Sequence, residues 1–288
     1  MTVIESAHAK INLFLDVTGR RPDGFHDIIS VMHSVSLCDM LSVSAEKSDR
    51  IEILLTTNVS SLPTDQTNLV YRSALAYMSK FGVLAKAKIH IEKNIPVGAG
   101  LGGGSSDAAA TLRAMNRIFG LASDKELLEL AAHIGSDVPF CLAGGTAICT
   151  GRGEKVKMLH NRKNMNFVIA IGEDRISTPE AYFRLDEKFG GFIDTYNKTG
   201  EDTSDIFITR IENGKNVSDL IYNIFESVTE LESIDKIKEM MTKNGAENTL
   251  MSGSGPAVFG IFKKMTDAES AGTSLVESGF LAFVCHTV

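Results

Sequence analysis

Hydrophobic and polar residues alternate with a period of two near the start of the chain. Such alternation predicts a strand, because successive side chains of a strand point to opposite faces. Within residues 2–18, one face of this strand holds Ile11, Leu13, Leu15 and Val17. The other face holds Lys10, Asn12, Phe14 and Asp16. A solvated strand face would explain Lys10 taken alone, whereas the three polar side chains together could line a polar cleft.

The rest of the pattern mixes helices and strands without strict alternation, which favours an α+β fold over a doubly wound sheet. Helices are predicted near residues 67–80, 106–118, 124–134, 204–211, 217–230, 233–243 and 266–278. Strands are predicted within residues 28–56 and near residues 87–91, 146–150, 167–171, 257–263 and 280–286.

Breaks in the pattern suggest how these elements are divided. Gly135 suits the position just after a helix end. Residues 152–166 are polar and basic, so we predict a boundary there between two lobes, 1–155 and 156–288. Residues 190–204 are rich in Gly, Thr and charged side chains and are expected to form a surface loop.

A glycine-rich motif lies between the strand near 87–91 and a strong helix. We call it the glycine segment; it consists of Pro96, Val97, Gly98, Ala99, Gly100, Leu101, Gly102, Gly103, Gly104, Ser105 and Ser106. Five glycines within seven residues let backbone N–H groups turn toward one point. Ser105, Ser106 and Asp107 are good N-cap residues for the helix, whose N-terminus attracts anions. We therefore predict a phosphate-binding segment; a turn that only caps the helix would need fewer glycines.

Other known phosphate loops fit this motif less well. A Walker A loop would require Gly-Lys-Ser/Thr, which does not follow. Gly98, Gly100 and Gly103 match the dinucleotide pattern formally, but residues 118–126 look like one helix ending and another starting rather than the required second strand. A protein-kinase loop would be accompanied by His-Arg-Asp and Asp-Phe-Gly triplets, and the chain has neither.

Composition narrows the class of ligand and partner. The 288 residues are 43% apolar and carry a net charge of −7, which argues against a general nucleic-acid surface. No apolar run is long enough to span a membrane, and the N-terminus has no secretory pattern. The four cysteines lack Cys-x-x-Cys spacing and the seven histidines form no zinc-type cluster. We expect a cytoplasmic protein with a small-molecule substrate, as a monomer or weak homodimer.

Three further segments could carry chemistry. Asp137, in Gly135-Ser136-Asp137-Val138-Pro139, is either a helix cap or a general base in a partly dry site. Phe25-His26 follows a turn and is either exposed or part of a base- or sugar-binding site. Residues 250–256, Leu-Met-Ser-Gly-Ser-Gly-Pro, form either a tight hairpin or a loop that closes on a ligand. Neither Gly/Ser segment fits the Gly-x-Ser-x-Gly nucleophile elbow, which argues against a serine hydrolase.

Taken together, these segments resemble the GHMP kinases over essentially the whole chain. The glycine segment is similar to their ATP phosphate loop, and Gly253-Ser254-Gly255-Pro256 to their C-terminal glycine motif. Residues 9–15, Ala-Lys-Ile-Asn-Leu-Phe-Leu, and residues 19–26, Gly-Arg-Arg-Pro-Asp-Gly-Phe-His, resemble a particular branch of this family. Members of that branch use ATP to phosphorylate the 2-hydroxyl of a CDP-linked methylerythritol, a step in the non-mevalonate route to isoprenoid precursors.

The resemblance implies two lobes, with the active site in the cleft between them, and roles for several residues. Asp137 would be the base and Lys10 its cationic neighbour, which would help keep that carboxyl ionised. Asn12, Phe25 and His26 would hold the cytidine, and Tyr182 could cover the other face of its base. The family more often has tyrosine where Phe25 stands, so the ring face is kept and one hydroxyl is lost. Mg²⁺ would arrive with ATP; no metal ligand is assigned, although Ser105 or Ser106 could contact the ion.

Other functions remain open from the sequence. Within the family, a homoserine or mevalonate-type kinase is the main alternative, and the Asp-Gly-Phe-His segment argues against it. A second alternative is a catalytically silent nucleotide sensor on the same fold, and the presence of both Lys10 and Asp137 argues against it. A dinucleotide oxidoreductase is a more distant third.

Overall fold

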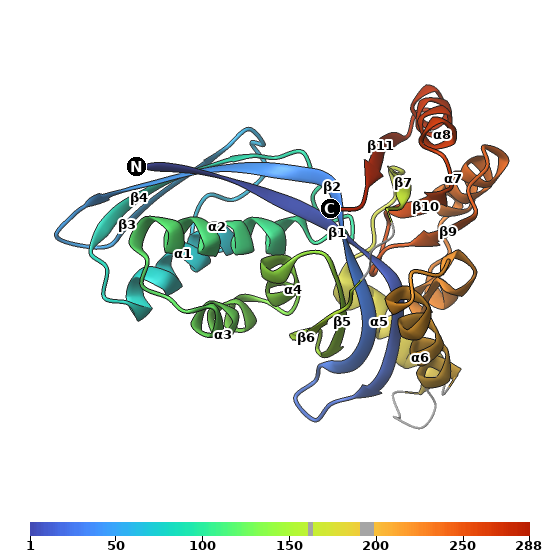
Figure 1. Cartoon of the computed structure of the whole chain (residues 1–288), viewed down its shortest axis with the longest axis horizontal. Helices are drawn as coiled ribbons and strands as arrows, with labels where there is room; N and C mark the ends of the chain where they lie inside the picture. Colours follow the sequence, from blue (N-terminus) through green and yellow to red (C-terminus); the bar gives the residue numbers. More distant parts are fainter. Residues whose placement is uncertain (161–163, 191–198) are drawn as a thin grey trace. The chain divides into compact units, whose positions relative to one another are not determined.

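The computed structural model describes residues 1–160, 164–190 and 199–288; for residues 199–203 it describes the backbone only. By internal contacts the chain divides into two compact units (Figure 1). The first contains residues 1–9, 37–97 and 102–144, and the second contains residues 10–36, 98–101 and 145–288. The long strands β1 (Thr2–Arg20) and β2 (His26–Lys47) therefore contribute residues to both units. The predicted boundary near residue 155 falls inside the second unit, and a functional division at that point stays a prediction.

The first unit is a sheet covered by helices. Strand β4 (Ala85–Glu92) pairs antiparallel with residues 40–47 of β2 and parallel with β3 (Glu52–Thr57). Its burial alternates residue by residue, which is typical of a sheet with one covered face. The helices of this unit are α1 (Leu69–Lys80), α2 (Gly103–Phe119), α3 (Asp124–Ile134) and α4 (Val138–Ala143).

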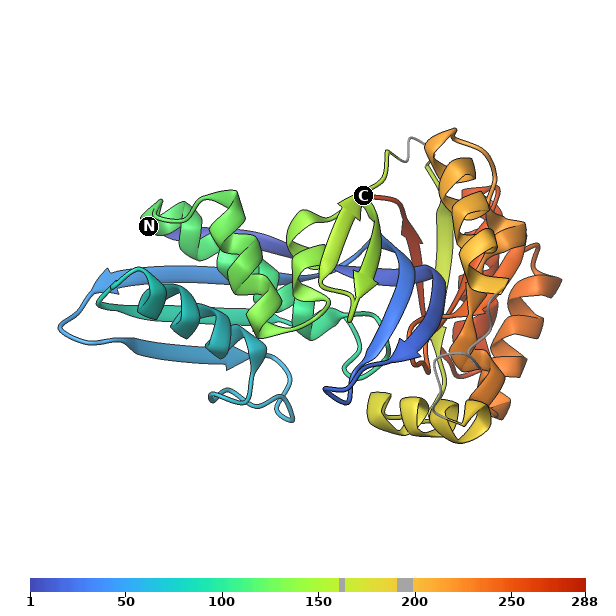
Figure 2. The same ribbon diagram turned by 90° about the horizontal axis from the view of Figure 1, so that it is seen from below.

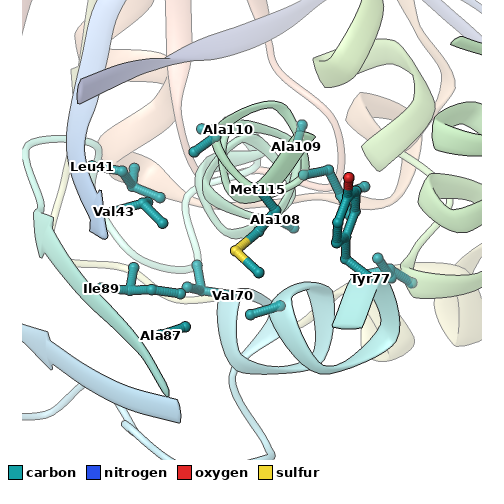
Figure 3. Packing of buried hydrophobic residues seen from close by; sticks show 14 of the residues in the cluster. Leu41, Val43, Val70, Tyr77, Ala87, Ile89, Ala108, Ala109, Ala110 and Met115 are labelled. Atoms are coloured by element: carbon teal, nitrogen blue, oxygen red, sulfur yellow. The ribbon is translucent and has the colours of Figure 1, made fainter. Parts of the chain in front are cut away.

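A continuous hydrophobic core joins this sheet to its helices. Figure 3 shows the labelled side chains that converge from β2, β4, α1 and α2, which include Leu41, Val43, Ala87, Ile89, Val70, Tyr77, Ala108 and Met115. The alanines of α2 are fully buried, so this helix packs closely against its neighbours. The part of α2 directly after the glycine segment is thus packed into this core.

The second unit contains a separate sheet that is antiparallel throughout, with the strand order β11-β7-β10-β9. Its strands are β7 (Asn166–Ile171), β9 (Asn248–Met251), β10 (Val258–Phe262) and β11 (Leu281–His286). Helices α7 (Glu232–Lys243) and α8 (Met265–Glu277) lie beside this sheet (Figure 2) and pack their apolar residues on it. The five residues of β10 are all buried, which explains their continuous apolar pattern.

The remaining elements of the second unit surround β1 and β2. Strand β5 (Thr146–Gly151) pairs with residues 28–33 of β2 and with β6 (Lys155–Met158). The short strand β8 (Tyr222–Asn223) pairs with β1. Helices α5 (Thr178–Phe189) and α6 (Thr199–Glu212) complete the unit.

Some expectations about elements differ from the structure. Residues 217–230 form two 3₁₀ turns, Ser218–Leu220 and Ile224–Val228, around β8, so the single helix predicted there is wrong. Gly135 directly follows the last residue of α3, as expected, and its backbone is extended, at φ −175°. The expected surface loop at 190–204 lies largely outside the described residues, and α6 already begins at residue 199. Tertiary pairing with β1 accounts for the break in the helical pattern at β8.

Candidate functional site

The glycine segment adopts a backbone that only glycine takes readily. Gly98, Gly100 and Gly102 have φ angles of 71°, 80° and 68°. Residues with a Cβ pay a steric cost in this left-handed region. The three glycines alternate with Ala99 and Leu101, and α2 begins directly after them at Gly103. The positive φ angles explain why glycine stands at these three positions, while phosphate binding by the segment stays a prediction.

The start of α2 lies three residues earlier than expected, at Gly103 instead of residue 106. Its N-cap is Gly102, so Ser105, Ser106 and Asp107 lie inside the helix and the prediction that they cap it is wrong. The first amides of a helix have no carbonyl one turn back, and here these belong to Gly103, Gly104 and Ser105. The amide of Ser106 already donates to the carbonyl of Gly102 at 2.9 Å. The helix end that is predicted to bind an anion is therefore formed mainly by glycines.

The two serines of the segment have different surroundings. Ser106 is buried, and its hydroxyl donates to the backbone carbonyl of His8. Ser105 is half-buried in the first turn of α2. Of the two hydroxyls proposed for the phosphates or their metal ion, Ser105 is thus the better placed.

The Gly/Ser turn, residues 252–256, packs directly against the glycine segment. The amide of Ala257 donates to the carbonyl of Ala99 at 3.1 Å, and the hydroxyl of Ser252 donates to the carbonyl of Gly100 at 3.2 Å. A Cβ on Gly100 would collide with the carbonyl oxygen of Ser252. The turn also connects the antiparallel strands β9 and β10. It is therefore a hairpin turn that at the same time supports the glycine segment.

Two side chains that the sequence did not single out hold the Gly/Ser turn in place. The Asn223 amide donates to the carbonyls of Met251 and Gly253, both at 2.7 Å, while its own oxygen accepts the amide of Phe225. The hydroxyls of Thr178 and Ser254 lie 2.9 Å apart. Nothing in the local sequence marks Asn223, because its partners lie about 30 residues further along the chain.

Lys10 and Asn12 join the same part of the molecule. The Lys10 amide donates to the carbonyl of Leu101, and its Nζ donates to Asn12 Oδ1 at 2.7 Å. Asn12 in turn donates to the hydroxyl of Ser30. A Cβ placed on Gly253 would lie 3.5 Å from Lys10 Nζ, so the ammonium reaches the Gly/Ser turn. Residues 9–17 are all buried, which rules out the solvated strand face considered for Lys10.

Asp16 lies further along the same strand and is 1% exposed. Burial raises the pKa of its carboxyl from 3.8 to about 6, partly offset by a hydrogen bond from the amide of Val17. A raised carboxyl pKa means that the folded protein favours the protonated form. The stabilisation of the folded state is therefore lost as the pH rises from 3.8, the pKa of Asp16 in the unfolded chain, through about 6, its pKa in the folded protein.

Replacing Asp16 with asparagine should stabilise the protein at neutral pH. The shift from 3.8 to about 6 corresponds to at most about 3 kcal/mol, since one pKa unit is equivalent to 1.36 kcal/mol. Thermal unfolding at pH 7.5 should show a higher Tm for Asp16→Asn, and the difference should shrink toward pH 4. An equal difference at both pH values would show that ionisation of Asp16 does not reduce stability.

Of the residues expected at the cytidine end, His26 and Tyr182 are in contact, next to the hairpin between β1 and β2 that carries Phe25. The rings of His26 and Tyr182 stack, with centroids 4.6 Å apart and planes 22° apart. Phe25 is 51% exposed, and the Arg152 guanidinium lies 4.8 Å from its ring centroid. Because Tyr182 already stacks on His26, no base fits between these two rings in this arrangement. Tyr182 also packs edge-on against Phe225, with centroids 4.9 Å apart, so Phe25 is the more accessible ring of this group.

Asp186 gives His26 an acidic partner that the sequence did not reveal. Asp186 Oδ1 lies 2.8 Å from His26 Nε2, and its Oδ2 lies 3.3 Å from Arg20. Asp186 belongs to α5, which also carries Tyr182. The helix thus orients both the ring that stacks on His26 and the carboxylate that contacts it.

Asp137 occupies the N-cap position of α4, but its side chain accepts no hydrogen bond from the helix. Its backbone is helical, at φ −83° and ψ −12°, whereas capping residues are usually extended. The side chain is half-buried, and the three residues that follow, Val138, Pro139 and Phe140, are buried. The capping interpretation is therefore wrong. Lys10 belongs to the other compact unit, and its pairing with Asp137 stays a prediction.

Within residues 1–160, 164–190 and 199–288, no group of three or more His, Cys, Asp or Glu side chains is arranged to hold a metal ion. In the same part of the chain, no helix has both the length and the apolar character that crossing a bilayer requires.

Comparisons with known proteins agree with this geometry. Residues 68–145 match the GHMP kinases N terminal domain, and residues 212–279 match the GHMP kinases C terminal domain. The matched domains and the α+β architecture define a GHMP kinase fold.

The relatives narrow the family further. A 4-diphosphocytidyl-2-C-methyl-D-erythritol kinase of Caldicellulosiruptor saccharolyticus is 44% identical over 278 residues, which cover 95% of this chain and 92% of the relative. The enzyme of the same name from Bacillus cereus is 42% identical over 267 residues, which cover 91% of this chain and 88% of that relative. A crystal structure of 4-(cytidine 5′-diphospho)-2C-methyl-D-erythritol kinase aligns with a TM-score of 0.81 at 30% identity, over 99% of this chain and 98% of that one. The chain belongs to the 4-diphosphocytidyl-2-C-methyl-D-erythritol kinase family.

Proposed function

We propose that this protein transfers the γ-phosphoryl group of ATP to the 2-hydroxyl of 4-diphosphocytidyl-2-C-methyl-D-erythritol. The observation that carries the proposal is 44% identity to a kinase of that name along 95% of the chain. The paired His26 and Tyr182 rings beside an exposed Phe25 support a site for a pyrimidine base.

The glycine segment would bind the phosphates of ATP. The left-handed glycines would let backbone N–H groups turn toward the phosphates, and the amides at the start of α2 would offer the positive end of a helix dipole. Phosphoryl transfer requires positioning and neutralisation of charge more than covalent help from the protein. Mg²⁺ would enter with ATP as part of the substrate, and the hydroxyl of Ser105 is the side chain of the segment best suited to contact it.

Asp137 would accept the proton of the acceptor hydroxyl. Its side chain is not used to cap α4, and the buried residues after it provide the partly dry surroundings that suit a general base. Lys10 would provide positive charge near the transferred group. It is a buried ammonium, held by Asn12 and next to the Gly/Ser turn.

The cytidine would bind at the hairpin between β1 and β2. Arg152 covers one side of the Phe25 ring, so the base would stack on the other. Tyr182 would close over the base only by moving off His26, because the two rings now touch. Asn12 would reach the substrate from the strand that carries Lys10.

The direct test is ATP consumption with a panel of acceptors. ADP should form rapidly with 4-diphosphocytidyl-2-C-methyl-D-erythritol and at background rates with homoserine, mevalonate or no acceptor. A phosphorylated product from homoserine or mevalonate alone would assign the chain to another GHMP kinase activity. Nucleotide binding without turnover of any acceptor would indicate a sensor.

Replacing His26 with alanine should raise KM for the CDP-linked substrate far more than KM for ATP. Leaving a buried hydrogen-bonding group without its partner costs roughly 1–3 kcal/mol, which corresponds to about 5- to 150-fold in affinity. The measurement is steady-state kinetics with each substrate varied in turn. Phe25→Tyr is the matched control and should be tolerated, because the ring face is kept. Equal changes in both KM values would place His26 outside the cytidine site.

A further inference from the structure

A buried charged cluster lies in the first unit next to the start of α2. The Lys93 ammonium donates to Asp39 Oδ2 at 2.5 Å and to Asp107 Oδ2 at 2.7 Å. The side chains of Lys93, Asp39 and Asp107 are 4%, 0% and 3% exposed. They come from the residue after β4, from β2 and from α2, so one ammonium connects three parts of the unit.

Asp39 and Lys93 together hold the strand side of the glycine segment. Asp39 Oδ1 accepts the backbone amides of Asn94 and Ile95, at 2.6 and 2.7 Å. These residues directly precede Pro96, the first residue of the glycine segment. One carboxylate thus binds the ammonium and the backbone from which the glycine segment starts. Beyond Glu92, where β4 ends, Asp39 holds this backbone together with Asn58, whose side chain hydrogen-bonds the amide and the carbonyl of Lys93.

Lys93 also touches the helix side of the glycine segment. A Cβ on Gly103, the first residue of α2, would lie 2.9 Å from Lys93 Nζ and 3.0 Å from a methyl carbon of Ile95. Asp107, one turn further along α2, binds the same ammonium. The lack of a side chain at Gly103 therefore lets Lys93 pass under the first turn of α2, whose amides form the proposed phosphate site.

The charges of this cluster do not balance. Two carboxylates share one ammonium, and Asp107 Oδ1 is buried without a hydrogen-bond partner. Burial and the nearby Asp39 raise the pKa of Asp107, while Lys93 lowers it. An isolated buried charge is costly, so removing Lys93 would leave two buried acids facing each other. A buried ion pair is by itself weak evidence for a stabilising role, because the cost of desolvation offsets the attraction between the charges.

We propose that Lys93 is a positioning residue for the nucleotide phosphates. Through Asp39, its ammonium holds the backbone that precedes the glycine segment. Through Asp107, it holds α2 directly after the first turn of this helix. The two ends of the segment are thereby held at a set separation, and the amides of Gly103, Gly104 and Ser105 are held ready for the phosphates. Pre-organised donors bind an anion without the cost of ordering them at each encounter. This inference rests on the proposed function only in taking the glycine segment as the ATP site.

The test is Lys93→Met in the full-length protein, with a surface lysine as the control. We expect KM for ATP to rise by about tenfold or more, as for loss of a positioning contact, while KM for the CDP-linked substrate changes less than about twofold. Lys88→Met is the matched control, because Lys88 lies on β4 with its side chain 50% exposed, paired with Glu46. It should leave both KM values unchanged. An unchanged KM for ATP in folded Lys93→Met would overturn the proposal.

A second variant separates positioning from stability. Lys93→Met should lower Tm because it leaves two buried acids unpaired, and adding Asp107→Asn should restore part of the Tm by removing one of them. If Lys93 positions the segment, KM for ATP stays high in this double variant although Tm recovers. Recovery of KM together with Tm would show that Lys93 only stabilises the fold, and the proposal would be wrong.

Binding of a non-hydrolysable ATP analogue, measured by calorimetry, keeps the two proposals distinct. Weaker binding in Lys93→Met than in the wild-type protein supports the positioning role even if no acceptor is phosphorylated. A wild-type protein that binds the analogue but does not phosphorylate the CDP-linked substrate would contradict the proposed function alone. Equal affinity of wild-type and Lys93→Met for the analogue would overturn the role of Lys93.

Discussion

Replacing Asp137 with asparagine should lower kcat by about 10²- to 10⁴-fold, the usual effect of losing a general base. Asparagine keeps the size and shape of the side chain but cannot accept the proton of the acceptor hydroxyl. Affinity for ATP should barely change, because the phosphates would rest on the glycine segment. The substitution should also leave α4 intact, since the Asp137 side chain makes no capping hydrogen bond with it. Steady-state kinetics and thermal unfolding of the same preparations measure both effects.

A double-mutant cycle with Lys10 makes this prediction more specific. Lys10→Met should also slow turnover, and the combined loss should be smaller than the product of the single losses if both residues act on the same step. Ser136→Ala, next to Asp137 in the chain, is the control and should keep most of the activity. Near-normal kcat in Asp137→Asn would show that Asp137 is not the base.

Replacing Gly100 with alanine should severely weaken ATP binding. The new Cβ would meet the backbone carbonyl of Ser252, which cannot rotate away, and the residue has a φ of 80°. A left-handed backbone costs a residue with a Cβ about 1–2 kcal/mol, and overlap in a packed site typically adds about 1–3 kcal/mol. We expect a lower Tm and a loss of ATP affinity of about tenfold or more, if part of that cost falls on the bound conformation. Calorimetric titration with an ATP analogue measures the affinity.

Gly98→Ala separates the two causes. Gly98 has a similar φ of 71°, but a Cβ there meets no atom within 4 Å. This variant should therefore show the cost of backbone strain without the collision with the Gly/Ser turn. If both variants lost equal affinity and stability, the contact between the glycine segment and the Gly/Ser turn would have no role in nucleotide binding.

Local patterns were sufficient for most of the elements. The strand at residues 2–18, the helix at 124–134 and the strand at 257–263 agree closely with β1, α3 and β10. In each of these elements, the spacing of the apolar side chains in the sequence agrees with the faces that are buried in the structure. The helix predicted at 217–230 is wrong because its apolar residues are equally compatible with 3₁₀ turns, and pairing of β8 with β1 decided between the two.

The site shows the same division between local and distant causes. The glycine segment was visible because its glycines are needed for the local backbone: three of them have positive φ angles. The start of α2 was misplaced by three residues, because Ser105, Ser106 and Asp107 are good capping residues in isolation. In the folded chain Ser106 binds the carbonyl of His8 and Asp107 binds Lys93, so these side chains have partners far away in sequence.

The sequence by itself determined the glycine segment, the Gly/Ser turn and the family to which the chain belongs, because these depend on residue types at fixed short spacings. Only the tertiary structure decided which of these segments touch. It placed the Gly/Ser turn against Ala99 and Gly100, Lys10 next to Gly253, and Lys93 between two acids. The two residues in each of these contacts are separated by at least 14 and by up to more than 240 positions in the sequence. No local pattern encodes them, because they arise only when strands and helices pack into a common core.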